Sequence, residues 1–311
     1  MILVTGASGH LGKSLASALL ADGNSVRILV DKNNPHIDGA EIVKGNLLDI
    51  DSLKTAVYGV DTVYHLAAMV DYGPINKQLM HDVNVTGTKN LLSVSKASKF
   101  IYQSSTSVYG NKMRDNPATP STKCNPSTFY GITKALAEKL VLESKGIVLR
   151  APVIFGTRFN GPFFELLKML ESKRMPIIGS GTNRLQWVHV SDLLDALVLA
   201  MKKGTNGEVY LVAGNDIVTQ KQLYAILSDA IGAAHPSKRV PLPSAYALAY
   251  VQKAISVFTR KEPRVKLEYL RRITSDRTFD ISKAKRDLGY NPKNSYMGWA
   301  ADLANDYKSM Q

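Results

Sequence analysis

The feature that most constrains the fold of this chain is a glycine-rich turn near its amino end. A short apolar run, Ile2–Thr5, leads into the turn, and apolar residues at helical spacing follow it from Leu11 to Ala21. A strand, a tight turn and a helix in this order bring backbone N–H groups and the positive end of a helix dipole to one place. The sequence therefore predicts an anion-binding turn.

The glycine spacing narrows the anion to a pyrophosphate. Gly6 permits the tight turn, Gly9 lets a phosphate approach the backbone, and Gly12 lets the helix pack closely on the strand. This arrangement at the start of an alternating chain predicts a dinucleotide cofactor. Asp31 follows the second predicted strand, where a carboxylate can accept from ribose hydroxyls, which favours NAD. Lys32 could instead serve the extra phosphate of NADP, so both cofactors stay open.

Apolar runs and helical patterns alternate through the first half of the chain. Strands are predicted at 2–5, 25–30, 40–43, 62–66, 100–104, 147–151 and 209–212, and helices at 11–21, 52–58, 85–97 and 131–144. Alternation at this spacing predicts an α/β fold with a doubly wound parallel sheet of the Rossmann type. The rhythm changes after residue 156. We predict a cofactor domain at 1–156, to which about 181–213 return, and a smaller, mostly helical substrate lobe at 157–180 and 214–311.

Charge and composition limit the partners. The chain has 39 Lys and Arg against 26 Asp and Glu, a net charge of +13, which attracts anions in general. Its densest basic cluster, at 260–272, is interpreted as a solvated helix face, and no nucleic-acid partner and no metal site are predicted. Cys124 is the only cysteine, the chain begins with a strand, and no apolar run is long enough for a transmembrane segment. We expect a cytoplasmic protein.

Two polar residues stand four apart in a predicted helix. Tyr130 and Lys134 therefore lie on the same helix face. A free phenol has a pKa of about 10, and a nearby ammonium lowers it by favouring the phenolate. The pair could then exchange a proton with a carbinol or carbonyl oxygen. The hydroxyls of Ser104 and Ser105 end a predicted strand, at the sheet edge where ligands of such folds bind.

These motifs, with others in the same order, resemble the extended short-chain dehydrogenase/reductases of the NAD-dependent epimerase/dehydratase superfamily. The matching stretches are Gly6-x-x-Gly9-x-x-Gly12, Gly45-Asn46-Leu47, Asp61-x-Val63-Tyr64-His65-Leu66-Ala67-Ala68, Asn84-Val85-x-Gly87-Thr88, Ser104-Ser105, Tyr130-x-x-x-Lys134, Leu149-Arg150-Ala151-Pro152, Val188-His189-Val190-Ser191-Asp192 and Asp280-Ile281-Ser282-Lys283-Ala284. They span nearly the whole chain.

The resemblance implies roles for these residues. Ser105 would be the catalytic hydroxyl, Tyr130 the proton donor or acceptor, and Lys134 the residue that tunes Tyr130 and binds the nicotinamide ribose. The other residues implied in cofactor binding are Gly6, Ser8, Gly9, His10, Leu11, Gly12, Asp31, Lys32, Asn46, Leu47, Leu66, Ala67, Ala68, Asn84, Ser104 and Pro152. The family usually has Asp at the place of Asn46, and Asn84 could equally be a structural helix residue.

Two branches of the family fit the chain. Nucleotide-sugar epimerases and dehydratases commonly carry an arginine a few residues before the Val188-His189-Val190 motif, where this chain has Leu185, with Arg184 one place away. The pattern is more similar to 3β-hydroxysteroid dehydrogenases and dihydroflavonol reductases. This predicts an oxidoreductase that interconverts a secondary alcohol and a ketone on an apolar, steroid-, flavonoid- or lipid-like substrate.

The alternatives are a nucleotide-sugar 4-epimerase or dehydratase with retained NAD, and a cofactor-binding regulator without activity. The resemblance also implies a homodimer joined through helices near 84–97 and 130–144. The apolar stretch 240–250 could cover the substrate or make a weak peripheral contact with a membrane.

Overall fold

The computed structural model describes residues 1–70, 76–111, 113–156, 159, 161–259 and 267–309. Of the basic cluster noted in the sequence, Arg260, Lys261, Arg264 and Lys266 lie outside the described residues. Arg271 and Arg272 are exposed on a short helix.

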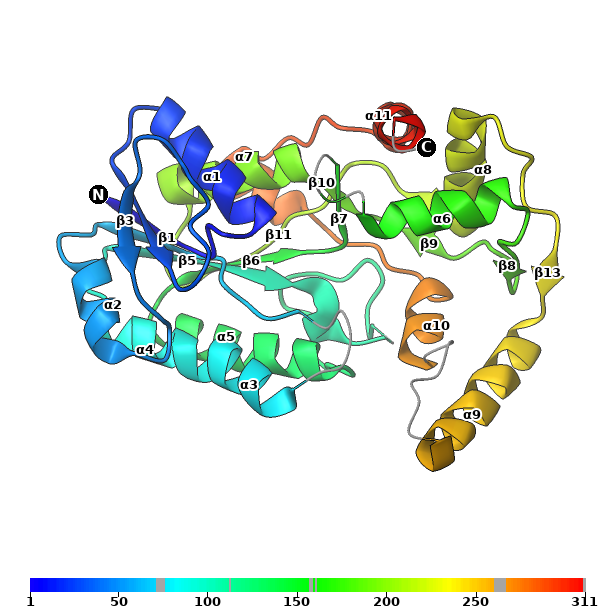
Figure 1. The fold of residues 1–311 in the computed structure, drawn as a ribbon, viewed down its shortest axis with the longest axis horizontal. Coiled ribbons are helices and arrows are strands. Elements are labelled where there is room, and N and C mark those ends of the chain that lie inside the picture. The colour runs from blue at the N-terminus through cyan, green and yellow to red at the C-terminus, as the bar shows by residue number, and fades with distance from the viewer. Residues whose placement is uncertain (71–75, 112, 157–158, 160, 260–266, 310–311) are drawn as a thin grey trace.

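A sheet of seven parallel strands forms the centre of the larger part of the chain (Figure 1). In the order of the sheet, the strands are β11 (Val209–Leu211), β6 (Ile147–Ala151), β5 (Lys99–Ser105), β4 (Thr62–His65), β1 (Ile2–Thr5), β2 (Val26–Val30) and β3 (Glu41–Lys44). The order runs outward in opposite directions from β1 and β4, so the crevice between their carboxyl ends is the switch point of the sheet. The predicted α/β fold class is confirmed.

Helices cover both faces of the sheet, because alternate side chains of each buried strand face opposite cores. One core packs α1 (His10–Ala21) and α7 (Val190–Lys203), and the other packs α2 (Ile50–Val57), α4 (Gly87–Val94) and α5 (Phe129–Glu143). The helix predicted at 85–97 begins as a π-helical turn, Asp82–Thr86, after α3 (Lys77–His81), and its α-helical part ends at Val94.

A separate aromatic core lies beyond the sheet. Phe155, Phe163, Trp187, Tyr296 and Trp299 pack together there, with ring centroids 4.8 to 6.5 Å apart. The elements around it are β7 (Ile154–Phe155), α6 (Gly161–Glu171), β8 (Ile177–Ile178), β9 (Arg184–Leu185), β10 (Val188–His189), β12 (Val218–Thr219), α8 (Gln220–Ile231), β13 (Arg239–Val240) and α11 (Tyr296–Lys308). The helices α9 (Leu242–Thr259) and α10 (Leu267–Ile273) form a small cluster of their own.

The chain returns to the sheet after α10. Phe279, Ile281 and Leu288, on a segment that ends in the π-helical turn Ala284–Leu288, pack in the core beside α7, although the sequence assigned this segment to the lobe. The division into a cofactor domain and a lobe stays a prediction, which the separate aromatic core supports. Within the described residues, no helix has the length and apolar character needed to cross a membrane.

A buried ion pair ties α5 to the sheet. The Glu138 carboxylate of α5 accepts from Arg150 Nη2 of β6 at 2.7 Å, and Glu138 also accepts from the Ser104 hydroxyl of β5. Arg150 Nη1 donates to Tyr109 Oη at 2.9 Å and to the Pro120 carbonyl at 3.0 Å. Since the side chains of Arg150 and Glu138 are only 6% and 3% exposed, each charge depends on the other.

We predict that Glu138→Gln lowers the free energy of unfolding by about 3–5 kcal/mol, because it leaves the Arg150 guanidinium buried without its counter-charge. Thermal unfolding should show a Tm lower by roughly 6 °C or more. The control is Glu143→Gln on the same helix, whose exposed pair with Lys139 at 3.9 Å should contribute less than about 1 kcal/mol. Equal Tm values for the two variants would contradict the structural role of Glu138.

Candidate active site

The glycine turn is packed so closely that two of its positions have no room for a side chain. Gly6 has a φ of +77°, and a Cβ there would lie 2.6 Å from the Ala67 nitrogen. A Cβ on Gly12 would lie 2.3 Å from the Gly6 carbonyl oxygen. Gly9 caps α1 without a side-chain hydrogen bond, and the first turn of α1 holds no acidic residue. The helix N-terminus is therefore open to an anion.

The rim of this turn carries several of the predicted cofactor residues. The pairing of Thr5 with Leu29 puts Asp31 and Lys32, both exposed, beside the turn at the end of β2. Ser8 Oγ donates to the Asn33 carbonyl at 2.8 Å and so ties the turn to this loop. His10 is exposed, with its ring edge-on to Phe159 at 5.9 Å, whereas Leu11 packs against the sheet core.

The remaining predicted cofactor residues follow other strands of the sheet. Asn46 Oδ1 accepts from the Leu48 N–H at 2.8 Å, so its amide is engaged in its own turn, and Leu47 is buried in the core. Leu66, Ala67 and Ala68 are half-buried directly after β4, and Pro152 is half-buried after β6. Ser104 is buried, and its hydroxyl is held by Glu138.

The start of α5 lies against the turn that follows β5. Thr128 caps the helix by accepting from the Gly131 N–H at 3.0 Å, and a Cβ on Gly131 would lie 2.7 Å from the Ser107 carbonyl oxygen. This close approach places Tyr130 on the first turn of α5 next to the segment that carries Ser105. Both side chains are half-buried. Ser105 Oγ donates to Ser107 Oγ at 3.1 Å and accepts from the Ser107 N–H.

Lys134 lies one helical turn below Tyr130 and is 2% exposed. Its Nζ donates to the Gln103 carbonyl at 2.6 Å and lies 4.1 Å from the centroid of the Tyr102 ring. Burial lowers the pKa of Lys134 to about 7, against a smaller opposing effect of Glu138. A buried ammonium is costly, so any acceptor or negative charge placed beside it is strongly favoured.

Asn84 braces the site rather than facing solvent. Its Nδ2 donates to the Met69 carbonyl and to Thr133 Oγ1, each at 3.0 Å, and its Oδ1 accepts from the Met69 N–H at 2.7 Å. Thr133 Oγ1 in turn donates to the Tyr130 carbonyl at 2.9 Å. Asn84 therefore joins the loop after β4 to the helix that carries Tyr130 and Lys134.

His65 links this brace to the glycine turn. Its Nδ1 is 2.7 Å from Thr5 Oγ1, and its Nε2 is 2.9 Å from Thr88 Oγ1. Because Thr88 donates its own proton to the Asn84 carbonyl, we assign the ring proton to Nε2 and an accepting role to Nδ1. Burial, followed by the charge of Lys134, lowers the pKa of His65 to about 3, so the ring stays neutral.

Arg277 holds the segment that follows Ser105, although no sequence motif pointed to it. Its Nη1 donates to the Gly110 carbonyl at 2.8 Å and its Nη2 to the Thr106 carbonyl at 3.2 Å, directly after Ser105. Burial, and next the charge of Arg272, lowers its pKa to about 9. A lone arginine far along the chain carries no motif that could have revealed this contact.

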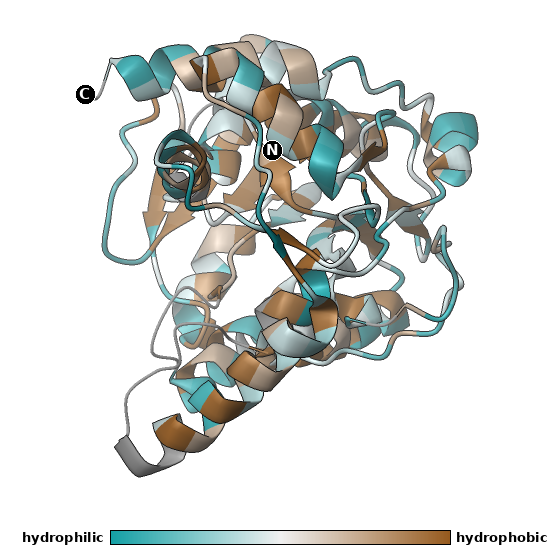
Figure 2. Cartoon of the chain, turned by 90° about the vertical axis from the view of Figure 1, so that its right-hand side faces the viewer, coloured by the Kyte–Doolittle hydropathy of each residue, from teal (hydrophilic) through white to brown (hydrophobic). Residues whose placement is uncertain are grey.

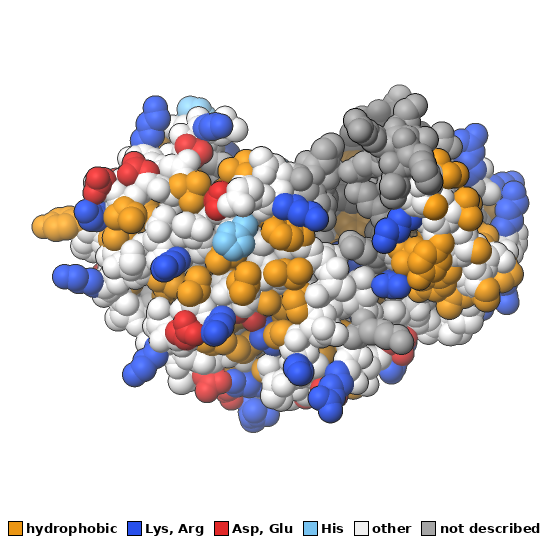
Figure 3. Space-filling model, turned by 90° about the horizontal axis from the view of Figure 1, so that it is seen from below, with side chains coloured by type: hydrophobic (Ala, Val, Ile, Leu, Met, Phe, Trp, Pro, Cys, Tyr) orange, Lys and Arg blue, Asp and Glu red, His pale blue; other side chains and the backbone are white. Residues whose placement is uncertain are grey.

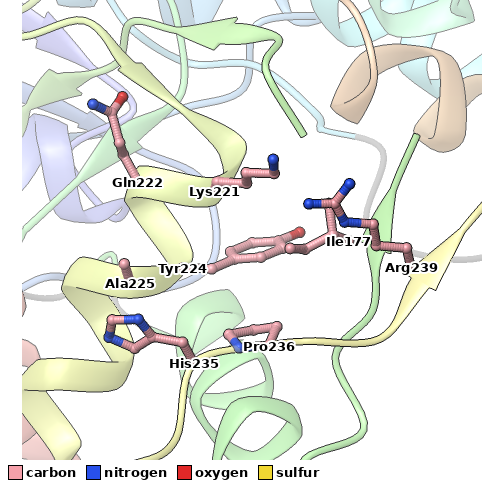
Figure 4. A pocket seen from close by; sticks show the side chains of 8 residues that line it. All are labelled: Ile177, Lys221, Gln222, Tyr224, Ala225, His235, Pro236 and Arg239. Atoms are coloured by element: carbon pink, nitrogen blue, oxygen red, sulfur yellow. The ribbon is translucent and has the colours of Figure 1, made fainter. Parts of the chain in front are cut away.

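One pocket lies away from these residues (Figure 4). It measures about 360 Å³ between α8, β8 and β13, and its lining includes Lys221, Tyr224 and Arg239. None of the predicted catalytic residues lines it.

Comparison with known proteins identifies the family. Residues 2–213 match the model of the NAD dependent epimerase/dehydratase family. The chain is 29% identical to sterol demethylase protein B of Methylococcus capsulatus, over 97% of each protein. It is also 29% identical to N-acetyl-alpha-D-glucosaminyl-diphospho-ditrans,octacis-undecaprenol 4-epimerase of Escherichia coli O157:H7, over 91% of this chain and 88% of that protein. A crystal structure of gox2253 superposes with a TM-score of 0.82 at 28% identity, covering 100% of this chain and 98% of that one.

The chain belongs to the NAD dependent epimerase/dehydratase family, and the resemblance noted in the sequence is confirmed. The prediction of an enzyme that uses a nicotinamide dinucleotide is confirmed at the level of this family. The roles of the individual site residues stay predictions.

We predict that Gly6→Ala abolishes measurable NAD binding, because the added Cβ would displace the backbone at Ala67 and with it the turn. Calorimetric titration with NAD is the measurement. Gly23→Ala is the matched control, since its φ of +79° imposes the same backbone strain while nothing lies within 4 Å of the added Cβ. Comparable NAD affinity in the two variants would show that the turn does not hold the cofactor.

Proposed function

We propose that this protein is an NAD-dependent oxidoreductase that interconverts a secondary alcohol and a ketone on an apolar substrate. The observation that carries the proposal is the placement of Tyr130 one turn above the buried Lys134, on a helix start that packs against the turn after β5. A proton-transfer pair thus stands at the carboxyl edge of a Rossmann sheet, beside its switch point.

The residues divide the chemistry between them. When bound, the nicotinamide ring supplies or accepts the hydride. In alcohol oxidation, Tyr130 takes the carbinol proton as the hydride leaves the same carbon, and Ser105 donates a hydrogen bond to the reacting oxygen. Lys134 favours the phenolate form of Tyr130 when it is charged, and a phenolate beside it would in turn favour the ammonium form that burial disfavours. Ketone reduction reverses each transfer.

The same proposal assigns the cofactor contacts. The N–H groups at the start of α1 would hold the pyrophosphate, and Lys134 would also hold the nicotinamide ribose. Asp31 at the end of β2 would accept from the adenosine ribose, and its charge would repel a 2′-phosphate, which favours NAD over NADP. We also propose a cytoplasmic location, because the half-buried Cys124 is a free thiol and a reducing compartment keeps thiols free.

An apolar substrate is favoured by the residues that stand where sugar enzymes commonly hold a diphosphate. Leu185 is buried in the aromatic core, and the neighbouring Arg184 is paired with Asp276 at 3.5 Å. Leu185 therefore offers no charge to a nucleotide diphosphate, and the Arg184 guanidinium already has a carboxylate partner. The similarity to a sterol demethylase protein agrees with this preference.

The rival function is a sugar 4-epimerase with retained NAD, which the similarity to the undecaprenol-linked epimerase favours. Both enzymes would begin with the same hydride step. Incubation with apolar secondary alcohols and with UDP- and dTDP-sugars separates them, because only a dehydrogenase accumulates reduced cofactor in solution. A regulator without activity would bind NAD and turn over none of these compounds.

We predict that Tyr130→Phe lowers kcat for any accepted alcohol or ketone by about 10²–10⁴-fold, since the phenyl ring cannot exchange a proton. NAD affinity should change little, which calorimetry would check. The readout of activity is the absorbance of the reduced cofactor. Tyr58→Phe, at an exposed tyrosine after α2, is the control and should keep full activity. Turnover in Tyr130→Phe equal to that of the wild type would remove Tyr130 from the mechanism.

We propose further that the protein is a homodimer joined through α5 and the helical segment near 84–97, together with α3, which leads into that segment. Ile132 and Leu136 stand four apart on α5 and are 40% and 42% exposed, and Leu79 of α3 is 42% exposed. Apolar side chains gathered on adjacent helices support an interface there.

The double variant Ile132→Glu and Leu136→Glu should convert a dimer to a monomer, because two carboxylates on each subunit would face each other. Light scattering gives the mass directly. Substituting Tyr58 by Glu, at a side chain that is 82% exposed elsewhere, should leave the mass unchanged. A wild-type protein that scatters as a monomer would refute the interface.

A further inference from the structure

Helix α9 exposes several large apolar side chains to solvent, which is unfavourable unless another surface covers them. Leu248, Val251 and Ile255 are 52%, 55% and 52% exposed, and their i, i+3, i+7 spacing places them on one stripe of the helix. The buried side of α9 is made by the small residues Ala245 and Ala249, which pack with Leu270 of α10. A helix with apolar residues on both its buried and its exposed side normally lies against protein or lipid.

The position of α9 leaves this stripe open. The helix projects from the lobe in Figure 1, and its hydrophobic segments continue along the projecting part in Figure 2. It is 18 residues long, and no described helix meets the requirements for a membrane span. The stripe can therefore lie on a bilayer surface but not pass through it.

The charge balance of the segment that carries the stripe favours an anionic surface. No Asp or Glu occurs between Asp229 and Glu262. Lys253 is exposed on α9, and the exposed Arg271 of α10 donates to Tyr250 Oη at 3.5 Å, both on the side of the helix away from the stripe. Figure 3 shows hydrophobic side chains beside Lys and Arg on this part of the molecule. Such a combination complements lipid headgroups with negative charge and repels a cationic partner.

Helix α10, against which α9 packs, is joined to the segment that follows Ser105. Asn183 Nδ2 and Gln220 Nε2 both donate to the carbonyl of Ile273, the last residue of α10, at 2.9 and 3.1 Å. Four residues later, Arg277 holds the carbonyls that follow Ser105. Helix α10, which packs with the buried side of α9, is therefore tied to the segment that follows Ser105.

We propose that α9 is a membrane-docking helix, which lies in the surface of a bilayer containing anionic phospholipid and brings the site to an apolar substrate dissolved there. The statement about the substrate rests on the proposed function, whereas the statement about docking does not. The occupant of the stripe is lipid, and a second copy of the chain or a protein partner is an outcome that the test can reveal.

Vesicle flotation tests the docking directly. The protein is mixed with vesicles of phosphatidylcholine alone or with about 30% phosphatidylglycerol. We expect at least about tenfold stronger binding to the anionic vesicles, weakened in about 0.5 M NaCl. The triple variant L248Q/V251Q/I255Q should bind at least about tenfold more weakly. The matched control Y58Q/I217Q/M297Q removes exposed apolar side chains elsewhere and should bind like the wild type.

Several results would overturn the proposal. These are no binding of the wild type to anionic vesicles, equal binding by L248Q/V251Q/I255Q, or equal loss in the control variant. A change of that stripe variant from dimer to monomer in lipid-free buffer would show that a second copy covers the stripe. Hydride transfer on a water-soluble secondary alcohol, measured without vesicles, reports on the proposed function alone. If this hydride transfer is absent, the proposed function fails, and the vesicle binding still tests the docking on its own.

Discussion

The close approach of two backbone segments at the switch point of the sheet is the constraint on which the rest of the structure depends. Gly6 lies so near the backbone at Ala67 that no side chain fits between them. The turn after β1 is therefore held by the segment after β4, and α1 begins directly over the crevice. Both the opening for an anion and the direction of α1 follow from this one contact.

The burial of Lys134 imposes a second constraint, in which chemistry opposes stability. An amine beneath Tyr130 can support a phenolate only if it is charged, but burial lowers its pKa to about 7. The Lys134 amine contacts the Gln103 carbonyl and the Tyr102 ring. The Glu138–Arg150 pair anchors α5, the helix that carries Lys134. A helix that carries such an amine needs this anchoring, since strained or costly groups persist only where the surroundings fix them.

The sequence was sufficient for the sheet and for the parts of the site that carry motifs. Apolar stretches predicted the strands of the parallel sheet, most of which have four or more residues and so are long enough to show their period. The paired strands of two residues, such as β8 and β13, are too short to show one. The roles of His65, Glu138 and Arg277 depend on partners distant in the chain, so no local pattern contains them. The apolar residues Phe279 and Ile281 would suit the core of either the cofactor domain or the lobe, and only packing decides which core they join.

The chain of hydrogen bonds from Thr5 through His65, Thr88, Asn84 and Thr133 to the Tyr130 carbonyl has a mechanical meaning. It runs from the glycine turn to the first turn of α5 through buried side chains whose neutral imidazole cannot change charge in the physiological range. A ligand bound along the crevice would thus contact, at its two ends, segments that one chain of buried hydrogen bonds joins, rather than two independent walls.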